Sequence, residues 1–157
     1  MELSTSSLSE VQQPPTPVIL LPCACANLRR AARIVTQSYD EALRPSGLRA
    51  TQFTLLQALN RAPGISQKQL AELLGADSTT LTRTLALLRR KGWIGSRPGN
   101  DRRELRLLLT AAGKREYRRV LPYWRSAQRR LRQALGEDGW KKLLDASVLT
   151  AEIAGCP

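Results

Sequence analysis

Apolar residues recur at helical spacing in two neighbouring stretches of the chain, which predicts a pair of helices joined by a tight turn. In the first stretch, the apolar face consists of Leu70, Leu73 and Leu74. Ser66 and Gln69 lie three residues apart and form a capping-box pattern, so the helix should begin at this serine. Gly75 should end it, because glycine readily adopts the backbone conformation that closes a helix.

The second helix should follow at once, capped by Asp77 or Ser78 and ended by Gly92. Its apolar residues recur at i, i+4 and i+7 and should face a core: Leu81, Leu85 and Leu88. The opposite face is polar and carries Ser78, Thr79, Thr82, Arg83, Arg89 and Arg90. Hydroxyl donors and an arginine near the start of a helix suit the major groove of DNA, where base edges and phosphates both lie within reach.

A period of two after the second helix predicts a hairpin. Trp93 and Ile94 begin an extended segment that turns at residues 98–101 and returns as residues 103–109. The return strand should pack on the helices through Leu105, Leu107 and Leu109. The tip of the hairpin carries three arginines and one aspartate: Arg97, Arg102, Arg103 and Asp101. This charge arrangement is typical of a wing that follows phosphates or probes a narrow minor groove.

Two further helices are predicted before this segment. In the first, which spans residues 27–43, the apolar stripe consists of Leu28, Ala32, Val35, Tyr39 and Ala42. Thr51 should cap the second, which should end at Asn60 and bury Phe53, Leu56 and Leu59. The N-terminal stretch that precedes them is rich in Ser, Thr and Pro and has little apolar surface to bury, so residues 1–21 should form a disordered arm.

After the hairpin, Thr110 should cap a long helix that runs to about Leu135. Pro122 lies inside this stretch and should kink the helix, because proline removes a backbone hydrogen bond. Gly136 and Gly139 should bracket a break before a final helix. The apolar residues of these helices include Trp124 and Trp140, large side chains of the kind found in association surfaces, although packing within one subunit explains them as well.

The chain resembles the winged helix-turn-helix regulators of the multiple-antibiotic-resistance regulator (MarR) family. DSTTLTRTLALLRRKGWI resembles the recognition helix of that family, and Asp101-x-Arg103 followed by Leu109-Thr110-x-x-Gly113 matches its wing and the start of the next helix. The resemblance covers about residues 26–154. It implies a mainly α fold: a winged helix-turn-helix with a two-stranded wing, and a helical dimerisation region formed by the N- and C-terminal helices.

The resemblance divides the chain into four parts: an N-terminal arm (residues 1–21), a dimerisation helix (22–46), a DNA-binding lobe (47–110) and C-terminal dimerisation helices (111–157). It implies a dimeric bacterial transcription regulator, with the residues nearest the bases on the second helix of the pair, Arg103 in the minor groove and Asp101 orienting that arginine. The candidate DNA-binding residues are Ser66, Gln67, Ser78, Thr79, Thr80, Thr82, Arg83, Arg97, Asp101, Arg102 and Arg103. Two recognition helices one duplex turn apart imply a palindromic operator in double-stranded DNA, and the family also implies repression.

The charge of the chain agrees with a nucleic-acid partner. Its 157 residues are enough for one domain and carry 25 Lys and Arg against 13 Asp and Glu, a formal net charge of +12. Such a charge favours polyanions, and affinity should fall steeply with salt. A non-specific architectural or RNA-binding protein is the alternative that this charge leaves open. An enzyme is not expected, because the chain has no histidine, no glycine-rich phosphate loop and no nucleophile with a recognisable base, and no cofactor is expected either.

The apolar run at residues 18–26, VILLPCACA, is too short for a membrane span, and the residues before it contain no lysine or arginine, as an export signal would require. We therefore expect a cytoplasmic protein that does not enter the membrane. An odd number of cysteines fits a reducing compartment better than a disulfide framework does.

The cysteines are candidates for an effector site. Cys23 and Cys25 precede the first helix and Cys156 is the penultimate residue, so in a dimer they are expected to converge on a soft ion, a metalloid or a thiol-reactive molecule. A zinc site would lack one ligand. The alternative is that Cys23 and Cys25 are buried as small apolar side chains and that Cys156 lies on a frayed chain end.

A second candidate for an effector site is an apolar cleft between the dimerisation helices and the DNA-binding lobe. The family commonly binds aromatic anions in such a cleft. The side chains expected to line it here are Arg33, Tyr39, Arg49, Phe53 and Trp93, although core packing explains Phe53 and Trp93 equally well.

Overall fold

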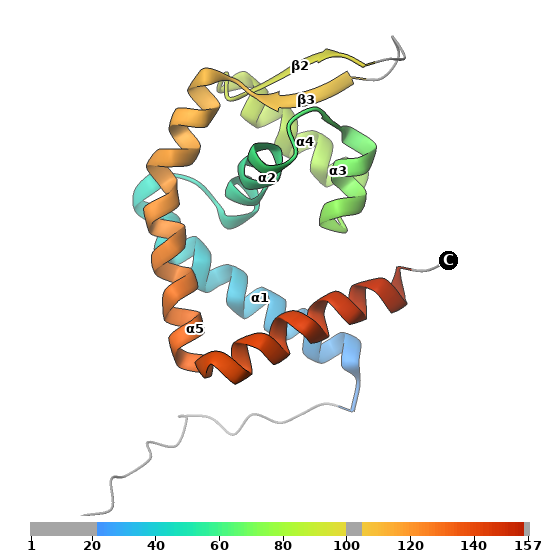
Figure 1. The fold of residues 1–157 in the computed structure, drawn as a ribbon, viewed down its shortest axis with the longest axis vertical. Helices are drawn as coiled ribbons and strands as arrows, with labels where there is room; N and C mark the ends of the chain where they lie inside the picture. The colour runs from blue at the N-terminus through green and yellow to red at the C-terminus, as the bar shows by residue number, and fades with distance from the viewer. Residues whose placement is uncertain (1–21, 100–104, 156–157) are drawn as a thin grey trace, which may run out of the picture.

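The computed structural model describes residues 22–99 and 105–155 (Figure 1). The elements follow in the order α1 (Ala24–Leu43), the 3-10 turn η1 (Arg44–Ser46), α2 (Ala50–Arg61), β1 (Ile65–Ser66), α3 (Gln67–Leu74), α4 (Ser78–Arg90), β2 (Ile94–Pro98), β3 (Leu105–Leu109) and α5 (Ala111–Ala154). The fold is mainly α with a small antiparallel sheet, as predicted. No helix within the described ranges combines the length and the apolarity needed to span a membrane.

The sheet has three strands in the order β1-β3-β2. The predicted hairpin is its larger part, with Ile94 paired to Leu109 and Pro98 paired to Leu105. The third strand, β1, pairs Ile65 with Leu107. The sequence indicated a wing of two strands only, because a strand of two residues is too short to show a period.

The predicted leucine face of the return strand is only partly buried. Leu107 and Leu109 belong to the core, whereas Leu105 is half exposed. Leu105 lies opposite Pro98, at the end of the ladder away from Ile94 and Leu109. The pattern of period two therefore predicted the right face of the strand, but not how far the core extends beneath it.

The core lies among α2, α3, α4 and the sheet, and also contains Leu43 at the end of α1 and Val120 of α5. All three predicted leucines of α4 are buried, together with Leu70 of α3 and five residues of α2: Leu81, Leu85, Leu88, Phe53, Leu55, Leu56, Ala58 and Leu59. Leu73 was expected on the same face as Leu70 but is 60% exposed. A helix of eight residues buries only a narrow stripe of side chains. Beside Leu70, the residue of α3 that lies on this stripe is Leu74, which is half buried.

The starts and ends of the helix pair agree with the prediction. Ser66 Oγ accepts the N–H of Gln69 at 3.2 Å and Gln69 Oε1 accepts the N–H of Ser66 at 3.1 Å, which completes the capping box. Gly75 closes α3 in the left-handed conformation, with φ 55°. Asp77 is the N-cap of α4.

The start of α2 differs from the prediction. The helix begins at Ala50 with Arg49 as its N-cap, and Thr51 lies inside the first turn instead of capping it. The carboxylate of Asp40, on α1, accepts the N–H of Ala50 at 2.6 Å. A side chain from the neighbouring helix thus supplies the acceptor that the sequence pattern assigned to the threonine.

Helix α5 begins as predicted, since Thr110 Oγ1 accepts the N–H of Gly113 at 3.0 Å. Pro122 lies inside the helix, and the break in helical φ and ψ falls at Gly136, whose φ is 68° and ψ is 171°. Pro122 and Arg118 lie on the exposed side of the helix, where the carbonyl that loses its partner can be hydrated. Gly139 was expected to bracket the break but lies within the helical segment that follows it.

Figure 1 shows the chain turning at this break, so that the C-terminal segment of α5 crosses α1 on the side of the molecule away from the wing. The two helices are in contact. In Figure 1, α2, α3, α4 and the sheet lie on one side of the molecule and α1 with the C-terminal segment of α5 on the other, and the first half of α5 runs between them.

Candidate nucleic-acid interface

The first turn of α4 is held in place by its cap. Asp77 Oδ1 accepts the N–H of Thr79 at 2.8 Å, and Asp77 Oδ2 accepts the hydroxyl of Thr80 at 2.7 Å. The hydrogen bond from the Thr80 hydroxyl, and to a smaller degree that from the Thr79 N–H, hold the pKa of Asp77 below its ordinary value. The carboxylate therefore stays ionised at neutral pH and fixes the backbone from which the polar face of α4 projects.

A second contact joins α4 to α3. Gln67 Nε2 donates to Thr82 Oγ1 at 2.8 Å, and the hydroxyl of Thr82 donates to the carbonyl oxygen of Ser78 at 2.7 Å. The structure thus brings together two predicted DNA-binding residues, Gln67 and Thr82, that lie fifteen positions apart. The contact fixes the relative position of the two helices at their polar surface.

The polar face predicted for α4 is exposed. Its members in the structure are Ser78, Thr79, Thr80, Thr82 and Arg83. Arg97, on β2, is exposed as well. Because the leucine stripe of α4 is buried on the opposite side, these hydroxyl and guanidinium groups face outward from a rigid support.

Ser66 does not belong to this surface. It is 5% exposed, and its hydroxyl oxygen accepts the N–H of Gln69 as the cap of α3. Its side chain therefore serves as a buried cap, and a contact of Ser66 with DNA stays a prediction. Asp101, Arg102 and Arg103 lie outside the described residues.

The structure adds an arginine that the sequence reasoning missed. Arg106 on β3 is the direct cross-strand partner of Arg97 on β2, so the two side chains share one face of the wing. Arg106 Nη1 also donates to the carbonyl oxygen of Gly64 at 3.3 Å. The strand register, which the sequence alone leaves open, was the missing signal.

The five side chains predicted to line an effector cleft make different contacts in the structure. Phe53 is 1% exposed and stacks on Tyr117 with ring centroids 5.5 Å apart, so it belongs to the core. The hydroxyl of Tyr39 donates to Gln128, and burial raises the pKa of this tyrosine. Trp93 lies beneath the ammonium of Lys91, which is 4.6 Å from the ring centroid.

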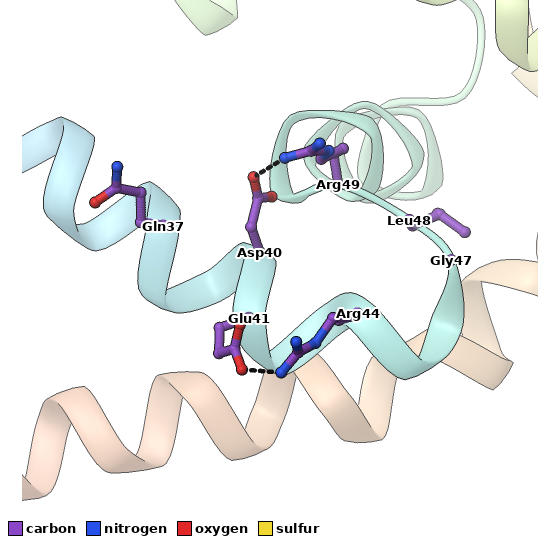
Figure 2. A pocket seen from close by; sticks show the side chains of 7 residues that line it. All are labelled: Gln37, Asp40, Glu41, Arg44, Gly47, Leu48 and Arg49. Atoms are coloured by element: carbon purple, nitrogen blue, oxygen red, sulfur yellow. Dashed lines mark hydrogen bonds and ion pairs between the residues drawn. The ribbon is translucent and has the colours of Figure 1, made fainter.

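The other two members of that set, Arg33 and Arg49, lie in different hollows. Figure 2 shows the hollow of Arg49, about 470 Å³ in volume, at the corner where α1, η1 and α2 meet. Arg49 Nη1 donates to Asp40 Oδ2 at 3.1 Å, and Arg44 pairs with Glu41. Each charged side chain drawn there thus has a partner of opposite sign. Arg49 thus belongs to a brace between α1 and α2, and the cleft expected from the sequence stays a prediction.

Arg33 lies instead beside the two described cysteines. Cys23 is the N-cap residue of α1, and Cys25 lies in its first turn. Both are exposed free thiols and line a hollow of about 670 Å³ together with Arg29, Arg30 and Arg33. Within this single chain they are therefore not buried as small apolar side chains. Cys156 lies outside the described residues, and within the described ranges no three His, Cys, Asp or Glu side chains are placed to hold a metal ion.

The order of elements and the exposed polar face of α4 define a winged helix-turn-helix DNA-binding protein. The model of the MarR family matches residues 46–104. An uncharacterised HTH-type transcriptional regulator of Bacillus subtilis, YwoH, is 30% identical over 93 residues, which span 59% of this chain and 68% of that protein. The chain belongs to the MarR family, and it is a transcriptional regulator and not an enzyme.

Solved structures agree with this assignment. The transcriptional regulator MosR of M. tuberculosis, in complex with DNA, is 37% identical, with a TM-score of 0.75 over 85% of this chain and 96% of that one. The transcriptional repressor CouR, bound to a 23-mer DNA duplex, is 27% identical, with a TM-score of 0.74 over 82% of this chain and 92% of that one. A cysteine-to-serine variant of MarR from E. coli, complexed with operator DNA, is 26% identical, with a TM-score of 0.70 over 80% and 92%.

Proposed function

We propose that this regulator is a homodimeric repressor that reads a palindromic operator with α4 and the β2–β3 wing and leaves it when an effector acts. The observation that carries the proposal is the exposed apolar surface of the last helical segment. Its members are Leu143, Leu144, Val148, Leu149 and Ile153, which are 41–69% exposed. A contiguous apolar surface on one helix segment marks an association site, because water contact with it is costly.

The place of this apolar surface favours a second copy of the chain as its partner. The segment lies with α1 in the layer away from the wing (Figure 1), and α1 itself exposes Leu28 and Ile34. A two-fold axis through this layer brings the same surface of each subunit together and leaves both α4 helices free for DNA. Two such helices one duplex turn apart require an operator with the same symmetry.

On the DNA side, the proposal assigns base contacts to the exposed side chains of α4 and phosphate contacts to the wing. Arg83 presents a guanidinium fork on the exposed face of α4, suited to the edge of a guanine. The facing pair Arg97 and Arg106 places two guanidinium groups at one level of the wing, where they suit contacts with a phosphate. The repressor role of CouR, a relative that is 27% identical, supports repression here.

The DNA-binding part of the proposal is tested with two arginine variants. Arg83→Ala should weaken operator binding about 5- to 150-fold at fixed salt, the loss expected for one base contact. Arg125→Ala, which removes the same charge from the exposed middle of α5, is the matched control and should leave affinity within about twofold. If the two variants lose affinity equally, the contacts of α4 are not sequence-specific. The protein would then be the non-specific architectural alternative and not a regulator with an operator.

The dimer is tested by placing a charge on the apolar surface. Leu149→Glu should convert the protein to monomers in sedimentation equilibrium, because an unpaired carboxylate cannot be buried in an apolar interface. Leu73→Glu is the control, since Leu73 is exposed to a similar degree but lies on α3. A wild-type protein that is monomeric at micromolar concentration would contradict the proposal.

For the release step we propose thiol chemistry at Cys23 and Cys25, with Cys156 as a third contributor. The two described thiols are exposed, and three arginines line the same hollow, so a thiolate formed there has positive charge nearby. Peroxide or arsenite should release the wild-type protein from the operator, whereas the triple Cys→Ser variant should stay bound. Release of the triple variant at the same concentrations would exclude the thiols as the sensor.

A further inference from the structure

The contact between the two helices of the pair fixes the side chain of Gln67, the first residue of α3. This side chain is half buried, and its Nε2 donates to Thr82 Oγ1 at 2.8 Å. The hydroxyl hydrogen of Thr82 is already donated to the carbonyl oxygen of Ser78, at 2.7 Å. A hydroxyl has only one hydrogen, so the oxygen of Thr82 can act toward Gln67 only as an acceptor.

These two hydrogen bonds determine which way round the amide of Gln67 lies. If the amide were turned over, Oε1 would face the oxygen of Thr82 with no hydrogen between the two acceptors. The plane of the amide is therefore held by α4, and the rotamers of the glutamine are restricted before any ligand arrives. A side chain ordered in this way loses little conformational entropy when it makes further hydrogen bonds.

The groups of the amide that Thr82 does not use are one donor and one acceptor. Nε2 carries a second hydrogen, and Oε1 accepts no hydrogen bond from any residue in the described part of the chain. A phosphate and the major-groove edge of guanine offer only acceptors, and the polar group of thymine is an acceptor too, whereas that of cytosine is a donor. Adenine offers the donor N6–H beside the acceptor N7, and is the base that matches both groups of an amide.

The place of the amide agrees with a contact to a base. Thr82 is exposed and lies on the polar face of α4, opposite the buried leucine stripe. A helix in the major groove brings such a face within reach of the base edges. Because Gln67 contacts Thr82, its amide lies at this same surface although it belongs to the preceding helix.

We propose that Gln67 is a specificity-determining residue, which reads one adenine in each half-site of the operator through N6 and N7, and that Thr82 is the positioning residue that holds its amide. The inference rests on the proposed function, because it requires α4 to enter the major groove of an operator. A bidentate contact of this kind discriminates against a wrong base about 5- to 150-fold. The two helices thus read the operator together, since α3 supplies the contact and α4 supports it.

Selection from a library of randomised duplexes, with the full chain, locates the adenine. The wild-type chain should select a motif with one adenine in each half-site that Gln67→Ala no longer selects, while the other positions keep their preferences. Gln67→Glu replaces the donor of the amide by a second acceptor, and should exchange this adenine for cytosine, whose N4 is a donor. Gln133→Ala removes the same side chain from an exposed position on α5 and is the matched control, which should select the wild-type motif.

A base analogue then tests the contact and its support. In the selected duplex, 7-deazaadenine has a carbon in place of N7 and still pairs with thymine. It should weaken binding of the wild-type chain about 2- to 10-fold and leave the affinity of Gln67→Ala unchanged, because that variant has no donor for N7. Thr82→Val cannot accept a hydrogen bond and should make the affinity insensitive to the analogue, whereas Thr82→Ser keeps the hydroxyl and should restore the sensitivity.

Three results would overturn the inference. If Gln67→Ala binds all duplexes more weakly but selects the wild-type motif, the glutamine contacts phosphate and reads no base. Sensitivity to 7-deazaadenine that persists in Thr82→Val would remove the positioning role of this threonine, since a merely structural role lowers affinity without changing the sensitivity. If the wild-type chain selects no motif, the operator and the inference fail together. A palindrome that Gln67→Ala leaves unchanged would refute the inference alone.

Discussion

Gly113 lies where α5 begins, against the backbone of Trp93 at the base of the wing, and replacing it by alanine tests how these two elements are joined. A Cβ atom at this position would overlap the carbonyl oxygen of Trp93 and would lie 2.9 Å from its carbonyl carbon. The same oxygen accepts the N–H of Thr110 at 3.0 Å. The clash is with backbone and not with the end of a flexible side chain, so rotamer changes cannot relieve it.

The magnitude follows from the separation that the methyl group requires. Carbon atoms pack at about 3.5–4.0 Å, so the start of α5 and the Trp93 backbone must move apart by at least about 0.6 Å. Overpacking of this kind costs about 1–3 kcal/mol. The better helix propensity of alanine recovers less than about 1 kcal/mol. We expect the melting temperature of Gly113→Ala to fall by roughly 3–8 °C at fixed protein concentration.

The assay is thermal unfolding followed by circular dichroism, with Gly139→Ala as the matched control. A Cβ at Gly139 has its nearest neighbour, the Cβ of Leu135, at 3.4 Å, which is an ordinary contact. The control should therefore gain about 0.5–1 kcal/mol from helix propensity and melt slightly higher. If Gly113→Ala melts at or above the wild-type temperature, α5 does not approach the wing as closely as described, and the argument from packing is refuted.

Three further predictions concern the caps and the wing. Asp40→Ala should cost about 1 kcal/mol in denaturant unfolding because it uncaps α2, whereas Glu41→Ala, which breaks an exposed ion pair, should cost close to nothing. The hydrogen bonds that Asp77 accepts lower its pKa, so this cap should stabilise α4 above about pH 4 and stop doing so as the pH falls further. A change in helicity between pH 5 and 8 that depends on Asp77 would contradict this assignment. Arg106→Gln should reduce the slope of log affinity against log salt by about 1, and an unchanged slope would remove this arginine from the phosphate contacts.

Local signals in the sequence predicted the caps and the buried face of α4 well. The capping box of Ser66, the cap at Asp77 and the cap at Thr110 each depend on hydrogen bonds within three residues, so the pattern contains all the information needed. The buried leucine stripe of α4 was also predicted correctly, because its spacing can be read from the sequence of this one helix. The MarR resemblance supplied the order of the elements around these local features.

Tertiary contacts decided the features that the sequence did not predict. The acceptor for the start of α2 comes from Asp40, ten positions earlier and on another helix, so Thr51 was assigned a role it does not have. Phe53 was predicted to line a ligand cleft because it is aromatic. In the structure it stacks on Tyr117, which lies sixty-four positions away in the sequence, so the sequence pattern could not show this contact. Arg106 became a candidate only through the strand register. Each of these required knowing which segments meet.

Footprinting of the purified full chain decides between a dimeric repressor and a non-specific binder; it uses genomic fragments from around the coding region of the protein, at physiological salt and with excess nonspecific competitor. The account predicts protection of a palindrome of about 20 base pairs, with two half-sites centred one duplex turn apart. It also predicts that Leu149→Glu, which separates the subunits, loses this protection. Uniform binding that the competitor removes, or protection of a single half-site by a monomer, would contradict the proposed dimeric repressor.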